Sequence, residues 1–469
     1  MAHLLIAAAH KSSGKTSVAI GLAAEMLRRG LAVQPFKKGP DYIDPLWLGR
    51  AAGRPCYNLD FFTMSHTEIV TSFATRSAGA DISLIEGNKG LFDGIDVEGS
   101  DSNAALAKML SAPVVLVIDA TGMTRGIAPL INGYLDFDRG VDVCGVIFNK
   151  VGGPRHEGKL RAALERYTDA EIIGAIGRDQ ALEIPERHLG LIPANEAEAV
   201  DATIRRLADA ASAGMDVDRL IGIAGMAESA HMEPQIAGAP AAAKPDVRIA
   251  VARDAAFGFY YPDDLEAFED AGAELLFFDA LSDSELPAAD GLFIGGGFPE
   301  MCLPALAANK SLRADIRQKL AAGMPAYAEC GGLMYLARNI RWRGEKCEMV
   351  GAVPGDVIVE DRPQGRGYVM IEETGKGLWP AASRSTSHSG AGIPAHEFHY
   401  ARLENLPADL DYAYRVIRGH GIDGHRDGLI VGNFLAGFVH HRNTEADPWV
   451  SRFVGFVREK SKIVCGYPA

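Results

Sequence analysis

A glycine, a lysine and a threonine near the N-terminus have the types and the order of a phosphate-binding loop. They lie in HKSSGKTS, residues 10–17, between the apolar run LLIAAA and an amphipathic stretch with helical spacing. In such a loop the glycine lets the backbone approach phosphate oxygens, the lysine neutralises them and the threonine hydroxyl can bind Mg²⁺. The following helix start adds its dipole. The residues predicted to bind ATP are Ser12, Ser13, Gly14, Lys15, Thr16 and Ser17.

Ala9 stands where the strict GxxxxGK[ST] pattern has its first glycine, so an ordinary Ser/Gly-rich helix start is the alternative interpretation. Two acidic residues favour the interpretation as a phosphate-binding loop. Asp41 in KKGPDYIDP follows the run VQPF, and Glu86 in EGNKGLFDG follows ISLI. The carboxyl ends of parallel strands converge on one crevice, so both acids can reach one ion. A Mg²⁺ ion that bridges phosphates usually takes one or two carboxylates. We therefore predict that Thr16, Asp41 and Glu86 hold Mg²⁺.

Charged and aromatic residues in the same two loops indicate a second ligand. Lysine binds an anion as a compact charge, so lysines beside an acidic metal site suit a substrate that carries several carboxylates. A solvated surface cluster is the alternative. The residues concerned are Lys37, Lys38 and Lys89, together with Tyr42, Asp44 and Asp93. Asn149, near the end of the apolar run CGVIFNK, is expected to contact the nucleotide base.

A cysteine in PAYAECGGLMYL has the surroundings of a nucleophile. Cys330 lies between an apolar run and a helix start, and Gly331 and Gly332 follow it. This order predicts a sharp strand-to-helix turn that exposes the thiol, and a helix start favours the reactive thiolate. The alternative is a buried structural thiol, which is the usual state of a free cysteine.

Backbone N–H groups and a histidine would complete this second site. The segment GLFIGGGFPE, residues 291–300, brings consecutive glycines to the end of another apolar run, where their N–H groups could form an oxyanion hole. The predicted oxyanion and glutamine residues are Gly295, Gly296, Gly297 and Gly331. The general base is expected at the end of a later strand, where LAGFVHHRN supplies His440 and His441.

A zinc site is the competing interpretation of these histidines. The segment HEFH, residues 396–399, lacks the i, i+4 spacing of HExxH. Adjacent histidines on a strand point to opposite faces, so His440 and His441 do not form a ligand pair. The pattern disfavours a catalytic zinc.

The spacing of apolar runs predicts the elements that carry these residues. Short apolar runs alternate with amphipathic stretches through residue 225, which is typical of βα units and a mostly parallel sheet. Residues 226–247 are rich in Ala, Pro and Gly and lack an apolar period, so we expect a linker there. The strand rhythm resumes from residue 248 and later becomes hairpin-like. We predict two α/β domains, 1–225 and 248–469.

Composition excludes several classes of function. The 469 residues carry 47 basic and 61 acidic side chains, a net charge of −14 that opposes general nucleic-acid binding. No apolar run is long enough to cross a bilayer, and the N-terminus lacks the basic region of a signal peptide, so we expect a cytoplasmic protein. The six cysteines are scattered without CxxC pairs, which predicts free thiols in a reducing compartment.

The motifs together resemble a known family. AECGG with the downstream FVH is similar to class I glutamine amidotransferases of the cobyric type, and HKSSGKTS, KKGPDYIDP, NLDFF and EGNKGLFDG resemble cobyrinic acid a,c-diamide synthases. The resemblance implies a dethiobiotin-synthetase-like ATP domain followed by a glutaminase domain. It assigns ATP and Mg²⁺ to Lys15, Thr16, Asp41 and Glu86, and the nucleophile and its base to Cys330 and His440. It assigns a tetrapyrrole carboxylate site to Tyr42, Ile43, Asp44 and Asp93, beside Lys38 and Lys89.

Two positions depart from the common pattern. Many class I amidotransferases have glutamate two residues after the catalytic histidine, where this chain has Arg442, so no third member is assigned to the Cys/His site. Lys89 stands where corrin-type enzymes usually have an apolar residue, and KKGP and EGNKGL favour the siroheme-amidating branch. We therefore expect sirohaem or sirohydrochlorin as substrate, with cobyrinate or hydrogenobyrinate as the alternative.

The resemblance predicts an amidation in which ATP activates an acetate carboxylate and glutamine supplies ammonia. Competing hypotheses are a P-loop NTPase of the partitioning or metallochaperone kind and a tetrapyrrole carrier without enzymatic activity. Phosphate release without glutamine would identify the first, and amidation coupled to ADP formation would exclude the second. A homodimer is a further expectation.

Overall fold

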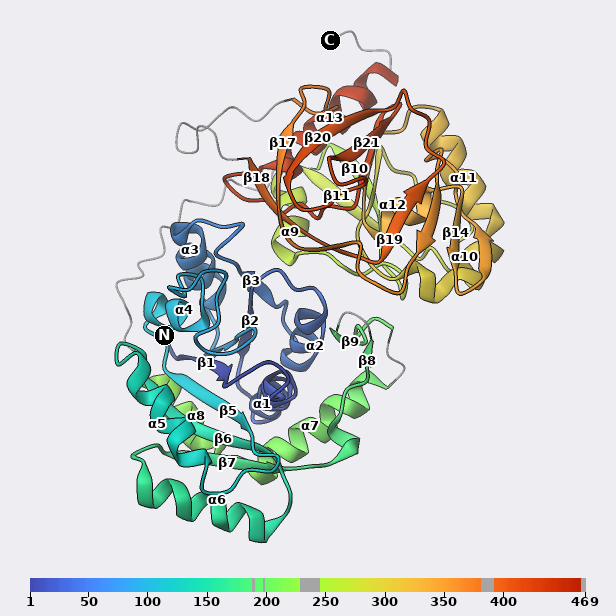
Figure 1. Cartoon of the computed structure of the whole chain (residues 1–469). Helices are drawn as coiled ribbons and strands as arrows, with labels where there is room; N and C mark the ends of the chain where they lie inside the picture. Colours follow the sequence, from blue (N-terminus) through green and yellow to red (C-terminus); the bar gives the residue numbers. More distant parts are fainter. Residues whose placement is uncertain (188–189, 197–198, 228–244, 381–391, 465–469) are drawn as a thin grey trace. The chain divides into compact units, whose positions relative to one another are not determined.

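The computed structural model describes residues 1–187, 190–196, 199–227, 245–380 and 392–464. Its contacts divide the chain into two compact units, Met1–Ile236 and Ala237–Ala469 (Figure 1). Of the linker predicted at 226–247, residues 228–244 lie outside the described part. The described cysteines, Cys56, Cys144, Cys302, Cys330 and Cys347, are free thiols. In the described ranges, no helix has both the length and the apolar composition needed to cross a membrane.

The first unit contains a seven-stranded sheet in the order β3-β2-β4-β1-β5-β6-β7, in which every pairing is parallel. Its strands are β1 (His3–Ala8), β2 (Val33–Lys38), β3 (Tyr57–Leu59), β4 (Ile82–Glu86), β5 (Val114–Asp119), β6 (Val143–Val151) and β7 (Ile172–Gly177). Strand β1 lies in the middle of the sheet and is buried throughout, as its unbroken apolar run predicts. The predicted mostly parallel sheet is confirmed.

Helices cover both faces of this sheet. One face packs against α3 (His66–Ser77), α4 (Asn103–Leu110), α5 (Ile127–Phe137) and α6 (Pro154–Tyr167), whose apolar residues join the strands in one core. On the other face α1 (Lys15–Arg28) packs against α2 (Ile43–Ala52) and α7 (Val200–Gly214), and α8 (Val217–Gly225) contacts β1. The short elements η1 (Gln180–Leu182), β8 (Glu186–Arg187) and β9 (Gly190–Leu191) follow β7. The predicted ATP and metal residues lie at or just beyond the carboxyl ends of β1, β2, β4 and β6, and at the start of α1.

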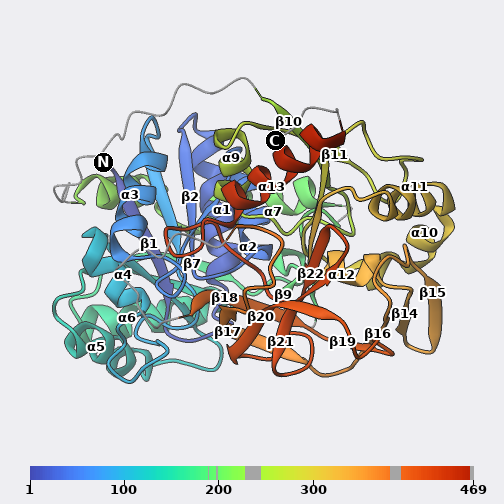
Figure 2. The same cartoon turned by 90° about the horizontal axis from the view of Figure 1, so that it is seen from above.

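The second unit is built on a nine-stranded mixed sheet, ordered β11-β10-β12-β13-β22-β21-β20-β17-β18. The half from β11 to β22 is parallel and the remaining pairings are antiparallel; Figure 2 draws the strands of the antiparallel half in orange and red. The parallel half comprises β10 (Val247–Ala252), β11 (Ala273–Phe278), β12 (Gly291–Ile294), β13 (Ala326–Glu329) and β22 (Phe434–Gly437). The antiparallel half comprises β17 (Gly365–Glu373), β18 (Ile393–His399), β20 (Asp411–Arg418) and β21 (Arg426–Val431). Hairpin-like pairing late in the chain therefore follows the prediction.

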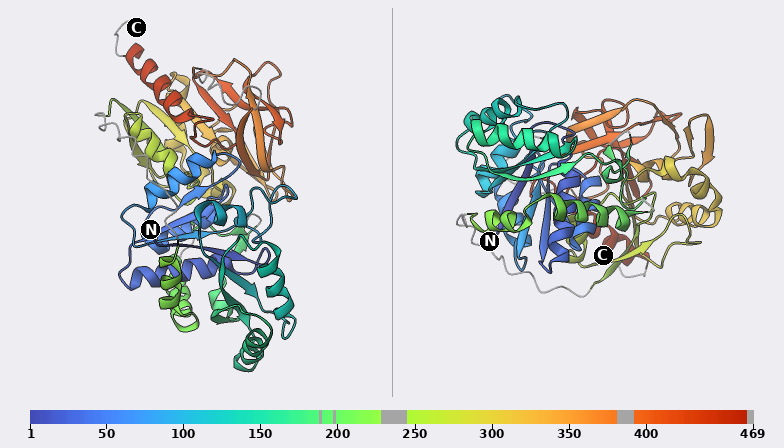
Figure 3. Two further views of the ribbon diagram at one scale, coloured as in Figure 1. Left: turned by 90° about the vertical axis from the view of Figure 1, so that its left-hand side faces the viewer. Right: turned by 90° about the horizontal axis from the view of Figure 1, so that it is seen from below.

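Two apolar cores lie on the two sides of the nine-stranded sheet. One includes residues of α10 (Leu303–Ala308), α11 (Lys310–Ala321) and α12 (Gly331–Leu336), which η2 (Pro299–Cys302) precedes. The other includes α9 (Pro262–Asp270) and the C-terminal helix α13 (Trp449–Val464), red in Figure 3. A small four-stranded sheet of β14 (Asn339–Trp342), β15 (Glu345–Glu348), β16 (Asp356–Val359) and β19 (Ala401–Glu404) follows α12. The short β13 and α12 meet at Cys330.

Candidate active sites

The phosphate-loop residues lie between the end of β1 and the start of α1. Gly14 is the N-cap of α1 and has φ 86°, a left-handed conformation that residues with a Cβ disfavour. A Cβ atom there would lie 2.0 Å from Asn149 Nδ2, which donates a hydrogen bond of 2.9 Å to the Ser13 carbonyl. Both conformation and space therefore require glycine at this position, and Asn149 from β6 holds the loop.

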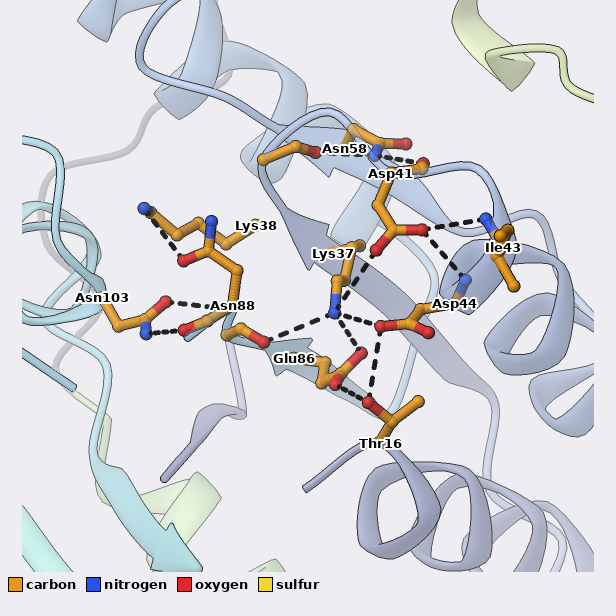
Figure 4. Close-up of polar contacts among 12 residues, drawn as sticks. Thr16, Lys37, Lys38, Asp41, Ile43, Asp44, Asn58, Glu86, Asn88 and Asn103 are labelled. Carbon is orange, nitrogen blue, oxygen red and sulfur yellow. Dashed lines mark hydrogen bonds and ion pairs between the residues drawn. The ribbon is translucent and has the colours of Figure 1, made fainter. Parts of the chain in front are cut away.

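Acidic side chains from two other loops converge on Thr16 (Figure 4). The Thr16 hydroxyl lies 2.5 Å from Glu86 Oε1 and 3.4 Å from Asp44 Oδ2. Glu86 is the last residue of β4, and Asp44 lies in the first turn of α2. Lys15 is buried beside them, and this burial, followed by the charge of Lys37, lowers the pKa of Lys15. The helix start and the two strand ends thus form one polar site.

Lys37 occupies the centre of this site, a position that sequence reasoning does not single out within the lysine cluster. Its Nζ atom lies 2.5 Å from Asp44 Oδ2, 2.8 Å from Glu86 Oε2 and 3.9 Å from Asp41 Oδ2 (Figure 4). Burial alone would lower the pKa of Lys37, but the three carboxylates, Asp44 first, raise it above its ordinary value. Lys37 therefore stays charged and compensates the acids. The sequence feature that could have identified Lys37 is its position at the carboxyl end of the apolar run VQPF.

Asp41 is placed differently from the other two acids. Its Oδ1 atom accepts hydrogen bonds from the backbone N–H groups of Ile43, at 2.8 Å, and Asp44, at 3.1 Å, so it orders the start of α2. Burial and then the charge of Asp44 raise the pKa of Asp41 to about 7. Burial also raises the pKa of Glu86. The raised pKa of Asp41 brings its titration close to neutral pH, whereas the raised pKa of Lys37 keeps that lysine protonated.

The oxygen atoms around Thr16 suit a magnesium ion that is also held by phosphates. Among the described residues, no group of three or more His, Cys, Asp or Glu side chains is arranged to hold a metal alone. Mg²⁺ in phosphate-transfer sites needs only one or two carboxylates because phosphates and waters supply the other ligands. Thr16, Glu86 and Asp44 offer such oxygens, and Asp41 lies on the far side of Lys37. The donor set fits Mg²⁺ bound together with a nucleotide.

The loop after β4 is held by Asn103, which sequence reasoning did not single out, and by the predicted Asp93. Asn103 donates to the Gly90 carbonyl at 2.8 Å and accepts from the Asn88 N–H at 3.1 Å (Figure 4). Asp93 accepts from the Gly90 N–H at 2.9 Å, so this carboxylate contributes to the loop's shape. Lys89 is exposed, with φ 38°. Its ammonium group is accessible to a solvent-borne anion.

The remaining predicted tetrapyrrole residues lie at the ends of β2 and α2. Lys38 Nζ lies 3.2 Å from Asn88 Oδ1, and burial lowers the pKa of this lysine. Tyr42 is the N-cap of α2 and is half-buried, whereas Ile43 is buried in the first turn. Ile43 therefore packs against the protein, and Tyr42 is the residue of the two that a ligand can reach.

A pocket beside the phosphate loop was not anticipated from sequence beyond Asn149. It encloses about 570 Å³ with its open mouth included. Ser17 of α1 and Asn149 of β6 line one part, and Arg178, Leu207 and Ala211 line others. Its residues come from five separate elements, α1, β6, β7, η1 and α7, so no local motif marks it. Its place beside Gly14 suits the base and ribose of a nucleotide.

Cys330 lies on a sharp turn between β13 and α12. It has φ 47°, and its N–H donates to the Gly437 carbonyl at 2.7 Å. A Cβ at Gly332 would lie 2.2 Å from the Ile294 carbonyl oxygen, so only glycine lets α12 approach β12 this closely. Gly331 lies against Gly297, where a Cβ would be 2.9 Å from the carbonyl oxygen. The predicted turn is present, but it does not expose the thiol as expected, because Cys330 is only 5% exposed.

His440 and Glu329 lie beside Cys330. His440 Nδ1 is 3.5 Å from Glu329 Oε2, and the imidazole also contacts the Cys330 thiol. Burial alone would lower the pKa of His440, but Cys330 first and then Glu329 raise it to about 10. His396 stacks on His440 with ring centroids 4.9 Å apart, and burial lowers the pKa of His396 far below its ordinary value. The protonated ring of this pair is therefore His440.

The residues after His440 point to other partners. His441 Nδ1 is 2.6 Å from Asp447 Oδ2, and the fully buried Arg442 donates to Asp263 Oδ2 at 2.9 Å. His440 and His441 thus face different partners, as expected for neighbours on an extended chain.

The glycine-rich loop after β12 lies against this site. A Cβ at Gly296 would be 2.6 Å from His440 Cε1, and one at Gly297 would be 2.0 Å from the Ala256 carbonyl oxygen. The Gly295 N–H donates to the Tyr260 hydroxyl at 3.0 Å. Among the predicted oxyanion donors, Gly295 is therefore committed to a structural bond, whereas Gly297 and Gly331 adjoin the nucleophile.

Comparisons with known proteins agree with this division. The CobQ/CobB/MinD/ParA nucleotide-binding domain family matches residues 4–192, and the CobB/CobQ-like glutamine amidotransferase domain family matches residues 248–447. A cobyrinate a,c-diamide synthase of Magnetococcus marinus is 45% identical, covering 97% of both chains. The enzyme of that name from Methanosarcina acetivorans is 41% identical, and the match covers 93% of this chain and 91% of the relative. The one from Caldanaerobacter subterraneus is 37% identical, and the match covers 96% of this chain and 97% of the relative. The chain belongs to the cobyrinate a,c-diamide synthase family and is a ligase that forms carbon–nitrogen bonds with glutamine as nitrogen donor.

Proposed function

We propose that this protein amidates the a and c acetate carboxylates of cobyrinate, using ATP and glutamine. The observation that carries the proposal is near full-length identity of 37–45% to cobyrinate a,c-diamide synthases, across both units. The preference for siroheme, which was expected from Lys89 and from the KKGP and EGNKGL segments, is not supported by these relatives. Cobyrinate, the earlier alternative, becomes the proposed substrate.

The first half of the reaction makes the carboxylate electrophilic. An acetate oxygen attacks the γ-phosphorus of ATP, the bond to the bridging oxygen breaks, and ADP leaves an acyl phosphate. We assign to Lys15 and Lys37 the charges that neutralise the transferring group, and to Gly14 the close approach of the backbone. Bound through Thr16, Glu86 and Asp44 or Asp41, Mg²⁺ would supply further charge neutralisation.

Tetrapyrrole recognition is assigned to the loops that surround this site. The carboxylates of a tetrapyrrole need cationic partners; Lys38 ends β2, and Lys89 lies on the loop after β4. Tyr42 offers an aromatic ring at the start of α2, and Asp93 shapes the loop that presents Lys89. The adenine and ribose are assigned to the pocket lined by Asn149.

The second half releases ammonia from glutamine. The Cys330 thiolate attacks the side-chain amide carbon, and the N–H groups of Gly297 and Gly331 are assigned to the resulting oxyanion. Protonated His440 gives its proton to the leaving nitrogen, so ammonia departs and a glutamyl thioester remains. His440 then takes a proton from water, which attacks the thioester and frees glutamate and the thiol. The ammonia displaces phosphate from the acyl phosphate and forms the amide.

A substrate panel tests the proposal. The protein is incubated with ATP, Mg²⁺ and glutamine, and separately with cobyrinate, hydrogenobyrinate, sirohaem and sirohydrochlorin, and the products are analysed by mass spectrometry. Two successive exchanges of hydroxyl for amino groups are expected with cobyrinate, with one ADP formed for each. Amidation of sirohaem at a higher kcat/KM would overturn the substrate assignment. ADP formation without any tetrapyrrole would instead support a P-loop NTPase.

A further inference from the structure

The glutaminase site has a histidine but lacks a carboxylate at the position that commonly orients it. Arg442 stands two residues after His440, and it is turned to Asp263 and stacked on the Tyr261 ring at 4.8 Å. The intervening His441 is paired with Asp447. Neither following residue therefore supplies a negative charge to the His440 ring.

Glu329, the residue immediately before the nucleophile, places a carboxylate beside the His440 ring. Only 3% of its surface is exposed. Both donors that anchor it, the Tyr327 hydroxyl at 2.6 Å and the His441 N–H at 3.0 Å, bind Oε1. The second oxygen, Oε2, is left facing His440 Nδ1 at 3.5 Å. One oxygen holds the carboxylate in place while the other is aimed at the imidazole.

We propose that Glu329 is a positioning residue that orients the His440 ring and stabilises its protonated form. With Nδ1 directed to the carboxylate, Nε2 is the nitrogen available to the Cys330 thiol, an arrangement equivalent to the orienting acid of other nucleophile–histidine sites. Strand pairing makes this possible, because β13 and β22 run parallel and Glu329 lies opposite Gly437, three residues before His440. The proposal rests on the glutaminase step assigned above.

Other charged groups around this pair do not replace Glu329. His396 stacks on His440, and its depressed pKa makes it neutral near pH 7. The titratable groups around Glu329, His440 and their direct neighbours are Tyr260, Asp264, Tyr327, Cys330, His396, His441, Arg442 and Asp447. The carboxylates in this set have other partners: Asp264 accepts from the Asn443 N–H and Trp449 Nε1, and Asp447 from His441.

The test compares Glu329→Gln with Asp264→Asn in the full-length protein. Both wild-type carboxylates are buried and accept one backbone N–H and one aromatic side-chain donor, but only Glu329 faces His440. Glutamate release from glutamine is expected to fall about 100-fold or more in kcat with little change in KM for Glu329→Gln. Asp264→Asn is expected to change thermal stability without that loss.

A pH measurement separates positioning from a structural role. Alkylation of Cys330 by iodoacetamide, followed by peptide mass spectrometry, should slow near neutral pH in Glu329→Gln, and its half-maximal rate should move to higher pH. The sign follows because removing the carboxylate destabilises the imidazolium, which lowers the population of the thiolate–imidazolium pair. Glu329→Asp restores the charge and should move the profile back toward that of the wild type.

Different results would contradict the positioning role of Glu329 and the glutaminase function on which it rests. An unchanged pH profile and kcat in Glu329→Gln, or a Glu329→Asp profile identical to that of Glu329→Gln, overturns the positioning role. Should Glu329→Gln fail to fold, Glu329→Asp and the Asp264→Asn control still distinguish the two roles. A purely structural role of Glu329 predicts that Glu329→Asp loses stability but keeps the wild-type pH profile of Cys330 alkylation. If Cys330→Ala retains glutamate release, the glutaminase assignment itself is wrong.

Discussion

Gly14 and Gly30 share a backbone conformation, with φ 86° and 88°, but differ in their surroundings. A Cβ at Gly30 meets nothing within 4 Å, whereas one at Gly14 would lie 2.0 Å from Asn149 Nδ2. Alanine at either position should cost about 1–2 kcal/mol of stability because the left-handed conformation is strained. Only Gly14→Ala should also weaken the binding of ATP, because the new Cβ displaces the Asn149 amide that holds the loop. The Kd for ATP should rise at least roughly tenfold. Calorimetric titration with MgATP and chemical denaturation measure the two effects, and a similar Kd in both variants would contradict this explanation.

The central position of Lys37 shows what residue types alone do not reveal. Lys37 and Lys38 are adjacent and chemically alike, yet only Lys37 lies among Asp44, Glu86 and Asp41. The distinction comes from the sheet, because β2 pairs with β4 in a register that places Lys37 opposite Glu86. Register is set by long-range pairing and by burial of one face, so a local motif could identify the loop but not its central cation.

At the scale of elements, the turn at Cys330 depends on how closely α12 approaches β12. Gly332→Ala would bring a Cβ within 2.2 Å of the Ile294 carbonyl, a backbone atom that cannot turn aside. We expect a loss of about 1–3 kcal/mol in stability, and glutamate release should fall because α12 carries Cys330 away from His440. Gly455 of α13 is the control, since a Cβ there meets nothing within 4 Å and alanine should be neutral or stabilise by up to about 1 kcal/mol. Thermal denaturation and glutaminase assays test the pair, and equal effects at both positions would argue against close packing as the cause.

The elements themselves were largely predictable. Unbroken apolar runs followed by glycine-rich loops indicated the parallel strands β1 and β4, and the elbow between β13 and α12, because these signals are local. Glu329 was not recognised as part of the second site because its relation to His440 depends on the pairing of β13 with β22, about 110 residues along the chain. The nucleotide pocket was missed for the same reason, as its walls come from separate elements.

At the scale of the whole molecule, each unit has its own sheet and its own apolar cores. The first unit's core joins β1 to β7 with four helices, and the second unit's cores lie on the two sides of its mixed sheet. Each predicted site therefore lies in a unit that has a core of its own. The two half-reactions should be separable by mutation.

Two substitutions, one in each unit, test this separation. Cys330→Ala removes the nucleophile, so glutamine-supported amidation should fall by at least about 1,000-fold while amidation with ammonium salts stays close to wild type, because ammonia then arrives without glutamine. Lys15→Ala removes a charge at the phosphate site, so amidation should be lost with either nitrogen source, although glutamate release continues. Amide formation is followed by mass spectrometry and glutamate by an enzymatic assay. Equal loss with both nitrogen sources in Cys330→Ala would mean that this cysteine supports the fold rather than the release of ammonia.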